Sequence, residues 1–190
     1  MEVKGSFAVP RQIRIIENGK VEVKRSYEMK GITEEMLALH RDSPGDALQK
    51  YLAWHPDHID RRYVEKRGRT IMLEKQKIGK RVYSMKASVP SSGGGSGGTM
   101  TWYYKIPLIP YQWQSQREFT PTGTTVHSTN IYGSDTPIVG WLWNLFLRKC
   151  VLPSFMTDFF KHQDEEAENT LKAVQEVWAE RNNKEKQPSK

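Results

Sequence analysis

The N-terminal part of the chain alternates apolar and polar residues in two runs joined by a tight turn. The runs IRIIE and KVEVKRSYEM flank Asn18-Gly19, a pair that favours a two-residue type I′ turn because both of its positions take positive φ. The alternation has the period of a strand with one buried face. We therefore predict a β-hairpin at the start of the chain.

Two short helices are expected after the hairpin. Thr33 precedes EEMLALHR and is a suitable N-cap. After a break at DSPGD, apolar residues recur at helical spacing at Ala47, Tyr51 and Trp54, and Pro56 ends the pattern.

Five segments rich in β-branched and aromatic residues come next, and Gly, Pro and Ser separate them. They are RTIMLEKQ, KRVYSMKASV, TMTWYYKIPLI, YQWQSQREFT and TTVHSTNIYG. Residues 91–98 read SSGGGSGG, a flexible low-complexity loop that resembles an engineered linker.

The last third of the chain has the pattern of one long helix. Pro137 suits its first turn, and apolar positions continue to about Trp178. Pro153 should kink or divide this helix near its middle. Residues 181–190 are expected to form a disordered tail.

This order of elements predicts a single α+β domain over residues 1–180. An antiparallel sheet of six to seven strands has an apolar face to cover, and the long C-terminal helix is the element large enough to cover it. The order resembles the helix-grip fold of the START/birch-pollen-allergen (SRPBCC) superfamily, a curved sheet wrapped around the helix. That resemblance implies a cavity between sheet and helix that binds an apolar or aromatic molecule.

Charge and composition narrow the possible partners. The formal net charge is +7, and residues 1–90 carry 19 Lys+Arg against 12 Asp+Glu, whereas residues 91–190 carry 10 of each. The basic residues fall singly among strand positions, as expected for a solvated face, and no nucleic-acid-binding motif is recognisable. We therefore expect no nucleic-acid partner.

The single cysteine, Cys150, excludes an internal disulfide and a CxxC metal site. The N-terminal residues lack the apolar core of a signal peptide. The most apolar run, IVGWLWNLFL, falls far short of the ~20 residues that a membrane span needs. The sequence thus predicts a soluble, cytoplasmic protein without a membrane span.

Two histidine motifs could carry chemistry. His55 and His58 in WHPDH form an HxxH pair, which either ligates a metal or caps the second helix in solvent. His162 and Glu166 lie one helical turn apart and could hold one ion together. A helical wheel places His162 on the polar side of its helix, however, where such a pair is more often solvated surface.

Further candidates lie on the predicted strands. Glu74 is a buried carboxylate in need of a partner if its strand face looks into the cavity, and ordinary surface otherwise. His127 could act as a general acid if it faces inward, but alternation allows only one of Val126 and His127 to be buried. Trp102 and Tyr104 share one strand face and form either core or the wall of a ligand site.

Together these motifs resemble the metal site of one branch of the superfamily, the diacetylphloroglucinol hydrolase (PhlG-like) domains. Those domains have a tryptophan-proline-histidine element after the short helices, a strand glutamate and a His-x-x-x-Glu pair on the last helix, which together hold zinc. The resemblance implies a divalent metal, with zinc the expected ion, bound by His58, Glu74, His162 and Glu166. The family histidine follows the proline, which favours His58 over His55.

The resemblance also implies an activity. The metal would polarise a ketone oxygen and activate a water, so that a carbon–carbon bond next to a carbonyl is hydrolysed in an aromatic or polyketide-like substrate. His127 would be the catalytic acid, and His55, Tyr51, Trp102 and Tyr104 would contact the substrate. The alternative is a non-catalytic carrier of an apolar or aromatic molecule, with purely structural histidines. The two alternatives differ in whether the purified protein holds a metal.

Overall fold

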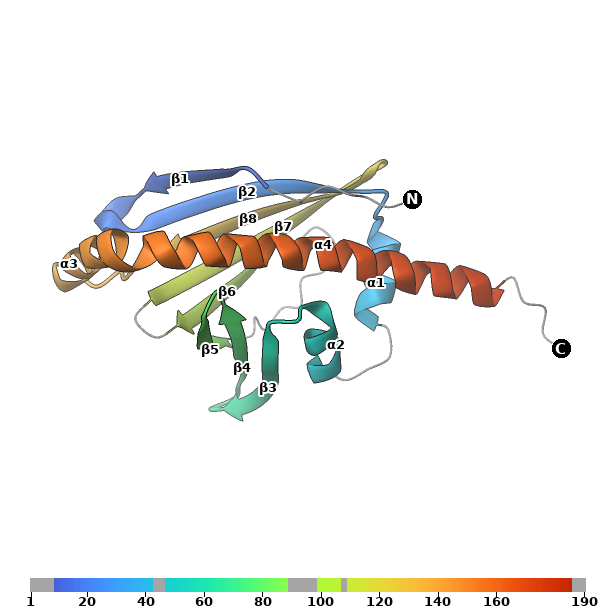
Figure 1. Ribbon diagram of the computed structural model, residues 1–190, viewed down its shortest axis with the longest axis horizontal. Coiled ribbons are helices and arrows are strands. Elements are labelled where there is room, and N and C mark those ends of the chain that lie inside the picture. The colour runs from blue at the N-terminus through green and yellow to red at the C-terminus, as the bar shows by residue number, and fades with distance from the viewer. Residues whose placement is uncertain (1–8, 43–46, 89–98, 107–108, 186–190) are drawn as a thin grey trace.

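The computed structural model describes residues 9–42, 47–88, 99–106 and 109–185. Its strands form one antiparallel sheet of eight strands in the order β1-β2-β8-β7-β6-β5-β4-β3. The strands are β1 (Arg11–Ile15), β2 (Val21–Lys30), β3 (His58–Lys66), β4 (Arg69–Ile78), β5 (Arg81–Ser88), β6 (Thr99–Ile106), β7 (Ile109–Thr120) and β8 (Gly123–Tyr132). Figure 1 shows the sheet curving around the long C-terminal helix, with β1 and β2 on one side of it and β3 and β4 on the other.

The helical segments lie in three places along the chain. A 3-10 turn, η1, joins β1 to β2. Helices α1 and α2 follow β2 and pack against the C-terminal helix, and the remaining helical segments end the described chain. Their bounds are η1 (Glu17–Gly19), α1 (Glu34–Asp42), α2 (Ala47–Trp54), α3 (Val139–Phe146), the π-helical segment η2 (Leu147–Val151) and α4 (Leu152–Glu185).

The α+β helix-grip architecture expected from the sequence is confirmed. At the hairpin turn both Asn18 and Gly19 have positive φ, 58° and 70°, as a type I′ turn requires. The N-cap of α1 is also confirmed, since Met36 N–H donates to Thr33 Oγ1 over 3.3 Å.

The number of strands differs from the expectation, because β3 was not predicted. Its apolar residues Ile59, Tyr63 and Val64 are all exposed, and it is an edge strand of the sheet. A strand without a buried apolar face lacks the alternation from which strands are recognised. No element was therefore predicted between Pro56 and β4.

The C-terminal helix is divided just before Pro153. Leu152 N–H donates to Leu147 O, five residues earlier, as in a π-turn. Proline has no N–H for the carbonyl four residues before it, so the helix widens there. Helix α3 starts at Val139, two residues later than expected, and α4 continues beyond Trp178 to Glu185.

Two apolar clusters fill the space between the sheet and the C-terminal helix. One joins the strands to the first turns of α4 through residues such as Tyr111, Tyr132 and Phe159. The other joins α1 to the later turns of α4 around Ile32 and Val174. Between the two clusters α4 carries polar side chains inward. None of the described helices is both long enough and apolar enough to cross a membrane.

Candidate metal centre

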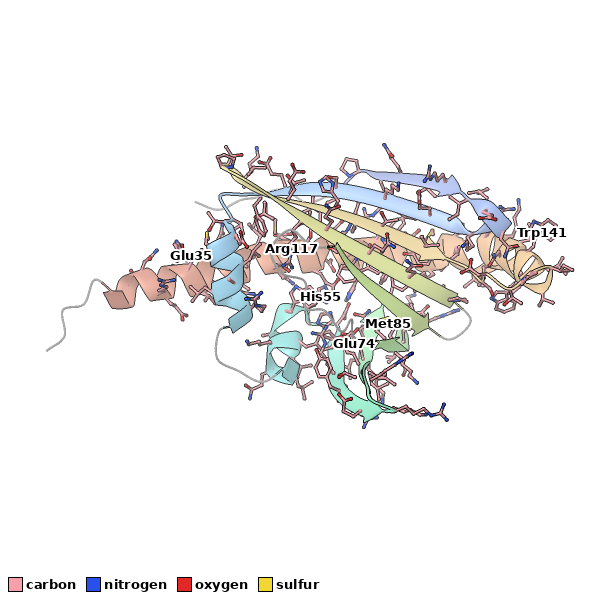
Figure 2. All side chains as sticks on the ribbon, turned by 180° about the vertical axis from the view of Figure 1, so that it is seen from behind. Glu35, His55, Glu74, Met85, Arg117 and Trp141 are labelled. Atoms are coloured by element: carbon pink, nitrogen blue, oxygen red, sulfur yellow. The ribbon has the colours of Figure 1, made fainter. Side chains whose placement is uncertain are left out.

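Three buried histidines meet where α2 and β3 face α4. The chain turns between α2 and β3, with His58 N–H bonded to His55 O over 3.1 Å, and α4 supplies His162. Their exposed fractions are only 2% for His55, 5% for His58 and 3% for His162. One ligand nitrogen from each ring lies within 4.8 Å of the others. Figure 2 shows His55 at this junction, in the middle of the molecule. The three rings could hold a metal ion.

His58 is held with one nitrogen free to act as a ligand. Its Nδ1–H donates to the carbonyl of Tyr51 over 2.6 Å, and the Tyr51 ring stacks on the imidazole at 3.8 Å. The other nitrogen, Nε2, is the atom that could bind a metal, and it lies 3.0 Å from Glu166 Oε1. A backbone carbonyl behind a histidine is the support that metal-ligating histidines ordinarily have.

Glu166 brings an anionic oxygen to the same point. Its Oε1 lies 3.0 Å from His58 Nε2 and 3.6 Å from His162 Nε2. Burial raises the pKa of this carboxyl, but hydrogen bonds and charge from His162 and His58 outweigh burial and hold the pKa below its usual value. Two ligands bound tetrahedrally at ~2.1 Å lie about 3.4 Å apart, so this spacing fits one small divalent ion.

His162 reaches the cluster from α4 through Nε2, and its other nitrogen is unsatisfied. Its Nε2 lies 3.0 Å from Gln76 Oε1, while its Nδ1 is buried and has no hydrogen-bond partner among the described residues. Buried polar atoms are rarely left unpaired. The placement of His162 on the polar side of the helix is wrong: the helix buries Phe159, His162 and Gln163 together.

His55 closes the cluster toward solvent. Its Nδ1 accepts the N–H of Asp57 over 3.1 Å, and its Nε2 lies 3.2 Å from Glu165 Oε2. The neutral ring thus carries its proton on Nε2, pointing at the carboxylate. Burial, with a smaller effect of His162, lowers the pKa of His55. A hollow of about 410 Å³ opens beside it, lined by residues including Lys161 and Glu165.

Glu74 is buried, but an arginine holds it. Arg61 Nε–H donates to Glu74 Oε1 over 2.7 Å, and a terminal guanidinium nitrogen contacts the same oxygen. Burial raises the pKa of Glu74, and Arg61 opposes that rise. The guanidinium also lies 3.9 Å from the centre of the Tyr51 ring. Glu74 and Arg61 therefore form a layer behind Tyr51 and His58.

The other candidates from the sequence lie apart from this cluster or outside the described side chains. His127 is on the outer face of β8, where it bonds Ser26 over 2.9 Å and lies 3.5 Å from Glu118. Trp102 and Tyr104 stand opposite Trp113 and Tyr111 in the register of β6 and β7, but their side chains are outside the described part of the structure. The loop 91–98 is outside it as well.

Several contributors were not found from the sequence. Gln76 shares the buried face of β4 with Glu74, and strand alternation alone would have placed it beside that carboxylate. Arg61 lies in the unpredicted strand β3, so no signal pointed to it. The helical pattern placed Glu165 on the solvent-exposed side of α4, so it was not a candidate.

No protein-family model and no curated protein sequence matches the chain. Solved structures do. Ara h 8.0201 matches with a TM-score of 0.55 at 9% identity, covering 85% of this chain and 99% of that one. The solution structure of the KanY protein matches at 0.51 and 18%, covering 83% and 99%. TTHA0849 from Thermus thermophilus matches at 0.50 and 15%, covering 82% and 98%. At these identities the likeness is one of fold: the chain has the helix-grip fold that these structures share.

Proposed function

We propose that the protein is a metal-dependent hydrolase that cleaves a carbon–carbon bond next to a carbonyl in an aromatic or polyketide-like substrate. The observation that carries the proposal is that Glu166 Oε1 lies 3.0 Å from His58 Nε2 and 3.6 Å from His162 Nε2. The PhlG-like resemblance supplies the reaction class.

The proposed ligands are His58, His162 and Glu166, a set of nitrogen and oxygen donors that suits zinc or a similar divalent ion. When bound, such an ion supplies Lewis acidity at a carbonyl oxygen and lowers the pKa of a bound water. Glu74, the fourth ligand expected from the sequence, would have to leave Arg61 to reach the ion. We therefore assign it a supporting role.

We assign proton transfer to His55 rather than to His127. His55 holds a proton on Nε2 against Glu165 at the edge of the hollow, whereas His127 lies on the outer face of the sheet. The lowered pKa of His55 keeps the ring neutral near neutral pH, so it can both accept and return a proton. Lys161 lines the same hollow and can hold an anionic oxygen of the substrate.

Elemental analysis of the purified protein, before and after zinc reconstitution, tests the metal site. We expect one divalent ion per chain in the parent, and its loss in His58→Ala, His162→Ala and Glu166→Ala. His127→Ala is the matched control and should keep the ion. Retention of the ion in all three ligand variants, or a parent that holds no ion after reconstitution, sinks the proposal and favours a carrier.

Two further variants separate the roles within the cluster. Glu74→Gln and His55→Gln should both keep the ion, and His55→Gln should lose release of acetate from diacetylphloroglucinol, used as the probe. If His55→Gln loses the ion instead, the three histidines hold it together and His55 is a ligand. If Glu74→Gln loses it, Glu74 is a ligand.

A further inference from the structure

Helix α3 presents apolar side chains to solvent along one whole face. Val139, Leu142 and Phe146 recur at helical spacing and are 68%, 57% and 45% exposed. Ile138, directly before the helix, is 80% exposed, and Trp141 is half exposed beside them. Soluble proteins leave single apolar residues at the surface, but a contiguous stripe of this kind marks an interaction surface. We call these five residues the α3 patch.

Polar contacts fix this orientation, so the helix cannot turn the patch inward. Asn144, on the opposite face, is 2% exposed. Its side chain donates to Asn18 O over 2.8 Å and accepts Ser134 N–H over 2.7 Å. Ile138 has φ 56°, a conformation that β-branched residues strongly disfavour. The fold thus holds a strained apolar residue out in solvent.

Basic residues follow the patch, and Asp135, which precedes it, is paired with Lys20. Residues 136–157 contain Arg148 and Lys149 and no acidic residue. Both basic residues follow the patch within one turn of Phe146. An apolar stripe with tryptophan and phenylalanine, followed by Arg and Lys, has the composition of a helix that lies in a membrane interface. Helix α3 lies at one end of the elongated molecule (Figure 1), where a flat surface can reach it.

We propose that the α3 patch docks the protein on a membrane surface rich in anionic lipid, with α3 lying in the headgroup region and Arg148 and Lys149 on the lipid phosphates. A second copy of the chain fits less well as occupant. A symmetric contact with the two α3 helices parallel would bring each Arg148-Lys149 pair toward its own counterpart, and like charges repel. An antiparallel contact would give a dimer that depends on Val139, which the test below detects. This docking surface is separate from the metal centre and does not depend on it.

Flotation of the full chain with vesicles tests the proposal. We expect binding to phosphatidylcholine vesicles that contain phosphatidylglycerol, little binding to phosphatidylcholine alone, and weakening at high salt. Val139→Glu should reduce partitioning at least about tenfold, since it removes apolar contact and adds repulsion. Val82→Glu is the matched control: Val82 is 60% exposed on β5, away from α3, and its replacement should change nothing.

A local readout supports the assignment to α3. Cys150, the single cysteine of the chain, is exposed in η2, one turn after Phe146. An environment-sensitive fluorophore on Cys150 should shift to the blue with anionic vesicles in the parent and in Val82→Glu, but not in Val139→Glu. Three results overturn the proposal: equal binding by both variants, no fluorophore shift in bound protein, or a parent dimer that Val139→Glu dissociates.

Discussion

The two halves of the C-terminal helical segment treat their side chains in opposite ways. Around His162, α4 buries polar residues, including Gln163, between the sheet and α2. Ahead of Pro153, α3 exposes Val139, Leu142 and Phe146. Ordinary packing would bury the second set and expose the first. Each region therefore departs from the usual burial of apolar and exposure of polar residues. Each departure lowers the stability of the fold, and folding alone gives no reason for it.

The two departures are held in place by the same means. At His162 the buried Nε2 contacts Gln76 Oε1 and lies 3.6 Å from Glu166 Oε1. At α3 the buried Asn144 ties the helix to the hairpin turn and leaves the apolar face outside. In both regions, buried polar groups determine which side of the helix faces the protein. Functional surfaces are where such local conflicts are expected.

Two phenylalanines sharpen this contrast most strongly. Phe159 in α4 is 4% exposed and belongs to the main core, whereas Phe146 in α3 is 45% exposed. We expect Phe159→Ala to lower the free energy of unfolding by about 3–5 kcal/mol because it leaves a cavity. Phe146→Ala should cost less than about 1 kcal/mol. Urea denaturation measures both.

Similar losses for the two phenylalanine variants would break the comparison. They would mean that Phe146 is packed in solution and that the α3 patch is covered by protein. The parent and both variants should show equal m-values, so that the difference reports on the folded state.

The sequence predicted the fold well where apolar alternation was strong. Strand β2, the two short helices and strands β4, β5, β7 and β8 all have buried apolar residues, and β1 was found through the Asn18-Gly19 turn. Strand β3 has no such residues, because Ile59, Tyr63 and Val64 point to solvent at the sheet edge. Missing β3 also hid Arg61, and with it the partner of Glu74.

The site was harder to predict than the fold because a hydrophobicity pattern does not reveal which polar residues are buried. A helical wheel finds the inner face of a helix from its apolar residues, and at His162 and Gln163 the inner face is polar. Both histidines of WHPDH lie in the cluster, but local spacing could not say that His58 would contact Glu166 while His55 would contact Glu165. That distinction depends on the turn into β3 and on the Tyr51 carbonyl.

Arg61 offers a second way to test how polar burial is supported. Replacing Arg61→Met keeps the bulk over Tyr51 but leaves Glu74 buried without its cation. We expect a loss of about 3 kcal/mol in unfolding free energy at neutral pH. Burial already raises the pKa of Glu74, and removing Arg61 raises it further. The folded variant then binds more protons than the unfolded chain, so its stability falls as pH rises through that pKa.

The pH dependence separates charge from packing in this variant. The deficit relative to the parent should shrink as the pH is lowered through the raised pKa of Glu74, because this carboxyl then becomes protonated. The double variant Arg61→Met/Glu74→Gln should recover part of the loss at neutral pH. A deficit that is constant with pH and is not relieved in the double variant would show that Arg61 contributes packing alone.

The smallest effect is expected at Trp54, whose indole ties the end of α2 to α4. Its Nε1–H donates to Thr170 Oγ1 over 2.7 Å and to Glu166 O over 3.0 Å. Trp54→Phe keeps an aromatic ring and removes this donor, so unfolding should become easier by about 1 kcal/mol. Because the second acceptor is the carbonyl of Glu166, a proposed ligand, zinc affinity should fall as well, by about 10–100-fold as for other lost supporting contacts.

Thr170→Val is the matched variant: it removes the hydroxyl acceptor but leaves the hydrogen bond from the Trp54 indole to Glu166 O. Zinc titration of both variants should therefore find Thr170→Val closer to the parent. The reverse order would place the support of Glu166 in the threonine hydroxyl, which itself bonds Glu166 O over 2.8 Å, rather than in the indole.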